Sequence, residues 1–146
     1  MKKLMTKLVL GFAAVGFTEM SAAIADERKA AYYAIADKAA ADYRDAHAAC
    51  DALDGNAQIV CIEEAKLAQT RTKGNAEAQY RNTAQARQKT GTDIANAEYA
   101  VAKARCESKE GNDKSACIRH AYALRIAAIA AAKAAQTTAN AGTGAR

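Results

Sequence analysis

The stretch CDALDGNAQIVCI at residues 50–62 recurs as CESKEGNDKSACI at residues 106–118, a shift of 56 residues along the chain. In both copies two cysteines flank a turn made of an acidic residue, a glycine and an asparagine, and an isoleucine follows the second cysteine. The match extends upstream, because Asp42-Tyr43 corresponds to Glu98-Tyr99. An internal repeat of this length sets the architecture, so the sequence predicts two copies of one structural motif.

Each copy is predicted to be a helical hairpin. The segments around both turns consist mostly of Ala, Lys, Arg, Gln and Glu, which have high helix propensity. Gly55 and Gly111 suit the left-handed conformation that ends a helix, and Asn56 and Asn112 can cap the helix that follows. A β-hairpin is not expected, because the flanking segments lack β-branched residues and the alternation of apolar and polar residues.

The spacing of alanines and larger apolar residues predicts an all-α fold. These residues recur at steps of three and four along the chain, as on one face of a helix. The predicted helices span about 27–53, 57–89, 93–109 and 113–136. They form two disulfide-stapled helical hairpins.

Two arrangements of the hairpins stay open at Thr90-Gly91-Thr92. A helix break there, which the sequence favours, allows a four-helix bundle, whereas one helix over 57–109 gives an elongated coiled-coil-like rod. Gly74 is expected to weaken its helix without ending it. The last helix carries a second apolar stripe, which in the rod needs a partner chain. The stripe consists of Ile118, Tyr122, Ile126 and Ile129.

The first 25 residues have the order of an export signal. A basic start with Lys2, Lys3 and Lys7 precedes an apolar run at 8–17, and Ala23-Ile24-Ala25 has small residues where a signal peptidase requires them. A membrane span needs roughly 20 apolar residues, so we expect cleavage after Ala25 and no stable membrane insertion of the remaining chain. The predicted location is the periplasm or the exterior of the cell.

The sequence thus divides into four segments. They are a signal peptide (1–25), a first hairpin repeat (26–89), a second hairpin repeat (90–136) and a flexible tail (137–146). Removal of the signal lowers the formal net charge from +5 to +3, because three lysines and one glutamate leave with it. Charges alternate in sign along the helices, which is typical of a solvated surface, and no nucleic acid partner is expected.

Four cysteines in an exported chain predict two disulfides, for which three connectivities are possible. The members of each pair lie five residues before and six residues after their glycine. With a rise of about 1.5 Å per residue, they fall at the same height on facing helices. This spacing favours Cys50–Cys61 and Cys106–Cys117. Each bridge is expected to add about 2.5–3 kcal/mol to the free energy of unfolding. This contribution supplements a core that must be built largely from the small side chains of the 41 alanines.

No catalytic, metal or cofactor site is predicted. The ten-residue gap within each cysteine pair does not suit thiol–disulfide exchange of the thioredoxin type. His47 and His120 each lie one helical turn from a cysteine, which gives the composition of a Cys₂His₂ metal site. Lys103 and Glu64 occupy their repeat-equivalent positions, so the histidines are not part of the repeated motif. No Ser/His/Asp triad and no glycine-rich phosphate loop occurs, and an enzyme is not expected.

The segments DALDGNA (51–57) and CIEEAK (61–66), with the Asp-Tyr or Glu-Tyr that precedes each turn, resemble a group of small exported proteobacterial proteins. These proteins are rich in Ala and Lys, carry tandem Cys-x10-Cys helical repeats, and are often labelled hypothetical or TolA-like cell-envelope proteins. The resemblance covers about 30–135 and implies a helical envelope protein without a known activity. The second turn departs from the first, with Glu107-Ser-Lys-Glu110 in place of Asp51-Ala-Leu-Asp54.

The expected function is that of a non-enzymatic periplasmic or cell-envelope structural or interaction protein, with a connection to envelope stress. Its expected partner is an unknown envelope protein or another copy of the chain. The alternative is a module that binds a small ligand, a metal or haem in the helix bundle or at His47 and His120.

Overall fold

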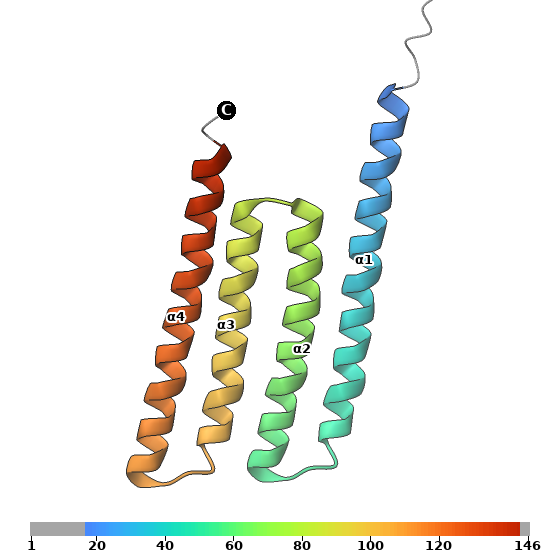
Figure 1. Ribbon diagram of the computed structural model, residues 1–146. Coiled ribbons are helices and arrows are strands. Elements are labelled where there is room, and N and C mark those ends of the chain that lie inside the picture. Colours follow the sequence, from blue (N-terminus) through green and yellow to red (C-terminus); the bar gives the residue numbers. More distant parts are fainter. Residues whose placement is uncertain (1–16, 144–146) are drawn as a thin grey trace, which may run out of the picture.

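The computed structural model describes residues 17–143, with side chains over 24–142. They form four α-helices, shown in Figure 1: α1 (Phe17–Cys50), α2 (Gly55–Arg81), α3 (Ala84–Cys106) and α4 (Gly111–Thr143). No strand occurs in this range. The predicted all-α class and the two helical hairpins, α1–α2 and α3–α4, are confirmed.

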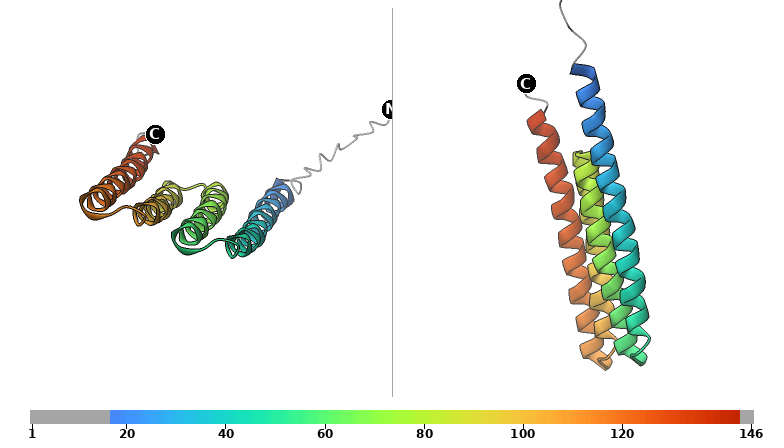
Figure 2. Two further views of the ribbon diagram at one scale, coloured as in Figure 1. Left: turned by 90° about the horizontal axis from the view of Figure 1, so that it is seen from below. Right: turned by 90° about the vertical axis from the view of Figure 1, so that its right-hand side faces the viewer.

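The four helices lie side by side in one layer and alternate in direction (Figure 1). Seen along the helix axes they form a single bent row (Figure 2). Within the described range each helix packs only on its neighbours in the chain, so α1 contacts α2, α2 contacts α3 and α3 contacts α4. Most domains close two layers around a common core. This arrangement leaves both broad faces of the layer uncovered.

Small side chains fill the seams between the helices. The largest fully buried side chains are those of Cys50 and Cys106. A buried CH₂ group contributes roughly 0.8 kcal/mol, so seams built mainly from alanine stabilise the fold weakly. The buried residues are Ala39, Cys50, Ala65, Ala76, Ala86, Thr90, Ala95, Val101, Ala104, Cys106 and Ala121.

The two hairpin turns repeat one another in detail. The N–H of Asp51 donates to the carbonyl of Ala48 at 3.2 Å, and the N–H of Glu107 donates to the carbonyl of Ala104 at 3.1 Å. Each pair is related to the other by the shift of 56 residues. The hydrogen bonds of the second turn therefore reproduce those of the first despite the change in turn sequence.

Each turn ends on a glycine with a positive φ, 59° at Gly55 and 51° at Gly111. Glycine enters this region without the steric penalty that a Cβ imposes. The predicted left-handed glycines are confirmed. The predicted cap at Asn56 is wrong, because its side-chain oxygen is buried and has no hydrogen-bond partner among the described residues.

The turn between the hairpins lies at Asn82–Thr83, and the break predicted at 90–92 is wrong. Asn82 has φ 47°, and its N–H donates to the carbonyl of Ala78 at 2.9 Å, which closes the end of α2. The Thr83 hydroxyl accepts a backbone N–H at 3.1 Å and caps α3. The second helix therefore ends at Arg81 and not at 89, and the third begins at Ala84 and not at 93. A turn at this place excludes one continuous helix over 57–109.

Gly74 and Gly91 bring helices together, and neither ends its helix. A Cβ on Gly91 would lie 2.8 Å from the Cβ of Ala132 in α4, and a Cβ on Gly74 would lie 2.9 Å from Cγ2 of Thr90 in α3. The Thr90 hydroxyl donates to the carbonyl of Gly74 at 2.9 Å. The absent side chains thus allow α2 and α4 to approach α3 closely.

The outer helices are longer than predicted. α4 continues to Thr143, so the loose tail predicted from 137 is helical as far as this residue, and 144–146 lie outside the described residues. α1 begins at Phe17, and the predicted cleavage site after Ala25 falls within it. Residues 1–16, which hold most of the predicted signal peptide, also lie outside the described part.

Candidate functional site

A disulfide closes each hairpin beside its turn. Cys50 is bonded to Cys61 and Cys106 to Cys117, and the two Cα atoms of each pair are 5.7 Å apart. No cysteine of the described chain is free. The predicted pairing is confirmed. Disulfides of this kind form and persist in oxidising compartments.

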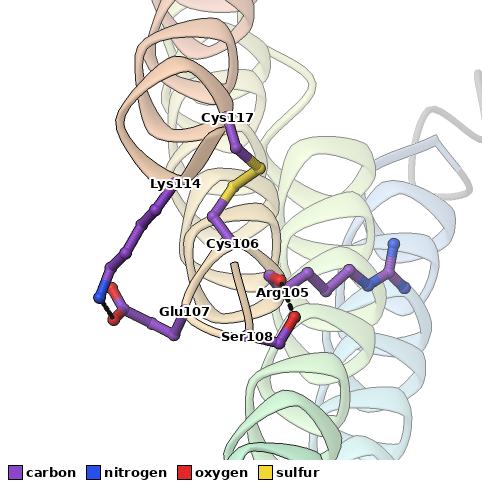
Figure 3. The surroundings of a disulfide bond; sticks show 6 residues. All are labelled: Arg105, Cys106, Glu107, Ser108, Lys114 and Cys117. Atoms are coloured by element: carbon purple, nitrogen blue, oxygen red, sulfur yellow. Dashed lines mark hydrogen bonds and ion pairs between the residues drawn. A yellow bond between two sulfur atoms is a disulfide. The ribbon is translucent and has the colours of Figure 1, made fainter. Parts of the chain in front are cut away.

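Exposed polar groups surround the second disulfide (Figure 3). Lys114 Nζ lies 2.6 Å from Glu107 Oε2, across the turn, and the Ser108 hydroxyl donates to the carbonyl of Arg105 at 3.0 Å. The hydrogen bond from Lys114 holds the pKa of Glu107 below its usual value. These contacts lie at the surface of the turn, and none of them involves a sulfur atom.

The two histidines are not brought together. His47 lies on α1, where its ring meets that of Tyr43 edge-on with 5.7 Å between the centroids. His120 is exposed on α4, and no contact links α1 with α4 in the described range. A site that uses both His47 and His120 is therefore not formed within one chain. Nor does any other group of three or more His, Cys, Asp or Glu side chains in the described range form a possible metal site.

An aromatic cluster joins α3 to α4. Tyr99 and Tyr122 meet edge-on with 6.1 Å between the ring centroids. The guanidinium carbon of Arg125 lies 5.4 Å from the Tyr99 centroid and 5.9 Å from the Tyr122 centroid, within cation–π range. Arg125 Nε also donates to Asn96 Oδ1 at 2.6 Å. The cluster therefore presents aromatic rings and a fixed cation at the surface.

A second aromatic cluster joins α1 to α2. Tyr32 stacks on Tyr80 with 5.2 Å between the centroids and an interplanar angle of 13°, and Tyr33 lies 5.1 Å from Tyr32. In the same hairpin, Tyr43 lies on α1 and Lys66 lies on α2, where it pairs with Glu63 at 2.7 Å. The Tyr43–Lys66 pair is the repeat equivalent of Tyr99–Tyr122.

Three tyrosines are exposed on one broad face of the layer, and the other three lie in the seams beside it. Successive helix residues are about 100° apart around the axis. With Ala39, Ala65 and Ala121 marking the buried seams within the hairpins, Tyr33, Tyr80 and Tyr122 fall to the same side of the layer, and all three are exposed. This surface is called the tyrosine face below. Tyr32, Tyr43 and Tyr99 lie close to the seam direction and are partly buried.

On the opposite face, two arginines form ion pairs with glutamates of the neighbouring helix. Between α2 and α3, Arg71 pairs with Glu98 and Arg105 pairs with Glu64, both at 2.6 Å. These pairs flank a shallow groove of about 440 Å³ lined also by Leu67. Exposed ion pairs contribute little to stability. This surface is called the ion-pair face below.

A larger groove of about 990 Å³ opens on the tyrosine face, where α1 runs past the α2–α3 turn. Tyr80 lines it together with Arg28 of α1 and Lys89 of α3. A hydrogen bond to Asp93 raises the pKa of Lys89 above its usual value. The groove is open to solvent. Sequence periodicity placed the tyrosines on helix seams but did not locate this groove, which depends on the turn at 82–83.

The fold and this face define the class of the molecule: a single-layer, disulfide-bonded helical repeat with one aromatic, cationic surface. Comparisons with protein families, with curated proteins and with solved structures find no match for the chain. Among the described helices, none is long and apolar enough to cross a membrane.

Proposed function

We propose that this chain is a non-enzymatic interaction protein of the bacterial periplasm or cell envelope, and that its tyrosine face binds an acidic partner protein. The observation that carries the proposal is the exposure of Tyr33, Tyr80 and Tyr122 on one face of an open layer, beside a groove that Tyr80 and Arg28 line. Tyrosine and arginine are enriched where proteins meet, because they supply large contact areas with polar ends. A broad, open surface also suits a macromolecule better than a small ligand, which prefers an enclosed pocket.

Charge on the tyrosine face supports an acidic partner. Lys29, Lys73 and Lys103 belong to α1, α2 and α3, are exposed, and have no ion pair within the described residues. On the ion-pair face, by contrast, Arg71 and Arg105 are matched by glutamates. Unmatched cations attract a surface of opposite charge and orient it during encounter. The unmatched lysines of the tyrosine face therefore support an acidic partner there.

Site-specific photo-crosslinking in cells tests the binding face. A photoreactive phenylalanine analogue at Tyr33 or Tyr122 is expected to capture an acidic envelope protein, whereas the same analogue at Leu124, beside the ion-pair face, is not. The triple variant Lys29→Glu, Lys73→Glu, Lys103→Glu should reduce capture at least tenfold, because each reversal turns an attraction into a repulsion.

The matched control reverses three cations away from the tyrosine face, by Lys38→Glu, Arg87→Glu and Lys109→Glu. It changes the net charge of the chain equally and should leave capture unchanged. Equal losses in both triple variants would mean that net charge, and not this face, governs binding. Equal capture from Leu124 and Tyr122 would contradict the proposed face.

The histidines discriminate between this proposal and the ligand-binding alternative. The double variant His47→Ala, His120→Ala is expected to retain crosslinking and any envelope phenotype of the native protein, because neither imidazole completes a site within the chain. Absorption spectra and mass spectrometry of the purified protein provide the second measurement. A copurifying metal or haem that disappears in the double variant without a change in melting temperature would favour the alternative.

The amino-terminal residue of the mature protein tests the predicted export. The basic, apolar and Ala-x-Ala order of residues 1–25 supports cleavage after Ala25, and the two disulfides are consistent with an oxidising compartment. Amino-terminal sequencing of protein from a periplasmic extract is expected to begin at Asp26. An intact Met1 recovered in the membrane pellet would contradict this prediction.

A further inference from the structure

The two repeats superpose without any offset in the structure. α1 and α3 end on the equivalent residues Cys50 and Cys106, and α2 and α4 begin on the equivalent residues Gly55 and Gly111. Each residue of the first hairpin can therefore be compared with the one 56 positions later. The chain contains two kinds of seam: one within each hairpin, formed twice, and one between the hairpins, formed once by α2 and α3.

Three pairs of equivalent residues in the seam within a hairpin are buried in both copies. Cys50 and Cys106 are buried, as are Ala39 and its equivalent Ala95. Ala65 and Ala121 form the third such pair and are buried as well. These positions are buried twice because both hairpins form the contact.

Residues in the seam between hairpins behave differently. On α3 this seam buries Ala86, Thr90, Val101 and Ala104. Their four equivalents on α1 are all exposed, because no helix lies beside the outer side of α1. These equivalents are called the α1 edge: Ala30, Ala34, Asp45 and Ala48.

The outer side of α4 shows the same contrast. Four residues of α2 that point toward α3 are partly buried, namely Val60, Leu67, Gly74 and Ala78. Their equivalents on α4 are exposed. These equivalents are called the α4 edge: Ala116, Ala123, Ala130 and Ala134. The layer therefore ends on two uncovered surfaces that correspond to the two halves of a contact already formed inside it.

We propose that a second copy of this chain covers these edges, with the α4 edge of one copy packed on the α1 edge of the next in the manner of α2 on α3. The direction of the helices continues to alternate across such a contact, since α4 and α1 run in opposite directions (Figure 1). Both outer helices also run past the α2–α3 turn at the same end, so they can pair beyond the length of α2 and α3.

The side chains at the closest approach fit this contact. Between α2 and α3, Gly74 lacks a Cβ where Cγ2 of Thr90 fills the space. The equivalent residues at the edges are Ala130 and Ala34. Ala34 has no Cγ2, so the Cβ of Ala130 finds room where a Cβ on Gly74 would not. The exchange of Gly and Thr for two alanines preserves the close helix approach.

Charges on the two edges are complementary. In the internal seam Glu77 of α2 and Asp93 of α3 line the same groove. Their equivalents are Lys133 on α4 and Asp37 on α1, which have opposite charges. Such a pair favours the contact between unlike edges over a contact between two like edges.

A second pair of polar residues faces one another in the proposed contact, nearer to the hairpin turns. Glu64 and Val101 line the same groove between α2 and α3. Their equivalents are His120 on α4 and Asp45 on α1. Asp45 is the polar residue of the α1 edge, and an imidazole faces it in the proposed contact. This match gives His120 a role that does not require a metal.

Assembly through unlike edges is open-ended, because each added copy leaves one α1 edge and one α4 edge free. Stability of such arrays is the sum of repeats and nearest-neighbour contacts, as in solenoid proteins. Successive copies related by the α2–α3 geometry place their tyrosine faces on the same side. The inference rests on the edges alone and stands whether or not the tyrosine face binds a partner.

Two blocking variants test the proposal with the purified, disulfide-bonded chain. Ala34→Arg obstructs only the α1 edge, and Ala130→Arg obstructs only the α4 edge. By multi-angle light scattering and sedimentation velocity, the native chain is expected to form species of increasing mass as its concentration rises. Each variant alone should stay at the mass of a single chain, which is 15.3 kDa before the predicted removal of residues 1–25. Their equimolar mixture should reach twice that mass and no more, because one free α4 edge meets one free α1 edge.

Matched controls place arginine elsewhere on the same helices. Ala31→Arg and Ala131→Arg alter exposed positions whose repeat equivalents, Arg87 and Asn75, are already polar and exposed. These variants should assemble like the native chain. Circular dichroism confirms that every variant keeps its helix content.

A charge reversal provides an independent test of register. Lys133→Glu is expected to weaken assembly at least tenfold, and Asp37→Lys in the same chain should restore it. A native chain that remains monomeric at millimolar concentration would overturn the proposal. Assembly that survives in either arginine variant alone, or a mixture that grows past the dimer, would equally contradict the contact between unlike edges.

Discussion

Replacement of both Cys106 and Cys117 by alanine is expected to lower the free energy of unfolding by about 2.8 kcal/mol, the chain-entropy value for a loop of this size. The two cysteines are 11 residues apart in sequence, as are Cys50 and Cys61, so the other pair should have an equal effect. Removal of both bridges is expected to cost about 5–6 kcal/mol. Small domains have only about 5–15 kcal/mol in total, and seams of alanine leave little reserve. The doubly bridgeless chain should therefore lose its tertiary packing at physiological temperature, although its alanine-rich segments keep local helix.

Urea unfolding followed by circular dichroism measures these differences. Alanine is the informative replacement, because Cys50 and Cys106 are fully buried and a serine there would add an unsatisfied hydroxyl. Ser108→Ala and Ser115→Ala, beside the same turn, form the control and should change stability by less than about 0.5 kcal/mol. Much helix signal should remain after reduction, because alanine-rich segments keep their local propensity. An unchanged unfolding midpoint in the Cys106/Cys117 variant would show that the bridges do not stabilise the fold.

The sequence was sufficient to predict the hairpins because their signals are local and occur twice. Two cysteines equidistant from a glycine define both the turn and the height of the bridge, so chain geometry alone selects Cys50–Cys61 over the other connectivities. Gly55 and Gly111 adopt the positive φ that their place in the turn requires. A duplicated signal of this kind depends little on tertiary contacts.

The turn between the hairpins was misplaced because a glycine has two uses in helical proteins. Gly91 looks like a helix breaker, but its contact with Ala132 comes from α4, which is remote in sequence. The true turn had a weaker signal in Asn82-Thr83, an asparagine that tolerates left-handed φ followed by a threonine that caps a helix. Without knowledge of the helix packing, nothing in the sequence favoured this pair over Thr90-Gly91-Thr92.

The sequence also could not predict the open layer or the tyrosine face. Periodicity indicates that α3 buries residues on two sides, one toward α2 and one toward α4. The angle between these two sides, measured around the helix axis, decides whether four helices close into a bundle or continue as a row. That angle follows from contacts such as Gly74 with Thr90, which bring α2 and α3 together at one close crossing. Once the helices form a row, residues such as Tyr33 and Tyr122 share a face although 89 positions separate them in sequence.

Gly91→Leu is expected to destabilise the α3–α4 contact. The Cβ alone would lie 2.8 Å from the Cβ of Ala132, and the rest of the side chain would extend into the seam. Overpacking of this kind costs about 1–3 kcal/mol. The gain in helix propensity on replacing glycine, about 0.5–1 kcal/mol, offsets part of that cost. The free energy of unfolding is therefore expected to fall by about 1–2 kcal/mol.

Two further variants separate crowding from other causes. Gly142→Ala adds a methyl group to α4 where nothing lies within 4 Å, so propensity should prevail there and stability should rise slightly or stay constant. In the double variant Gly91→Ala, Ala132→Gly the methyl group moves from one helix to the other, and the seam keeps its volume. This exchange should recover most of the stability that Gly91→Ala loses. If Gly91→Leu instead proved more stable than the native chain in urea, the close approach of α3 and α4 at this residue would be wrong, and with it the reason why Gly91 does not break the helix.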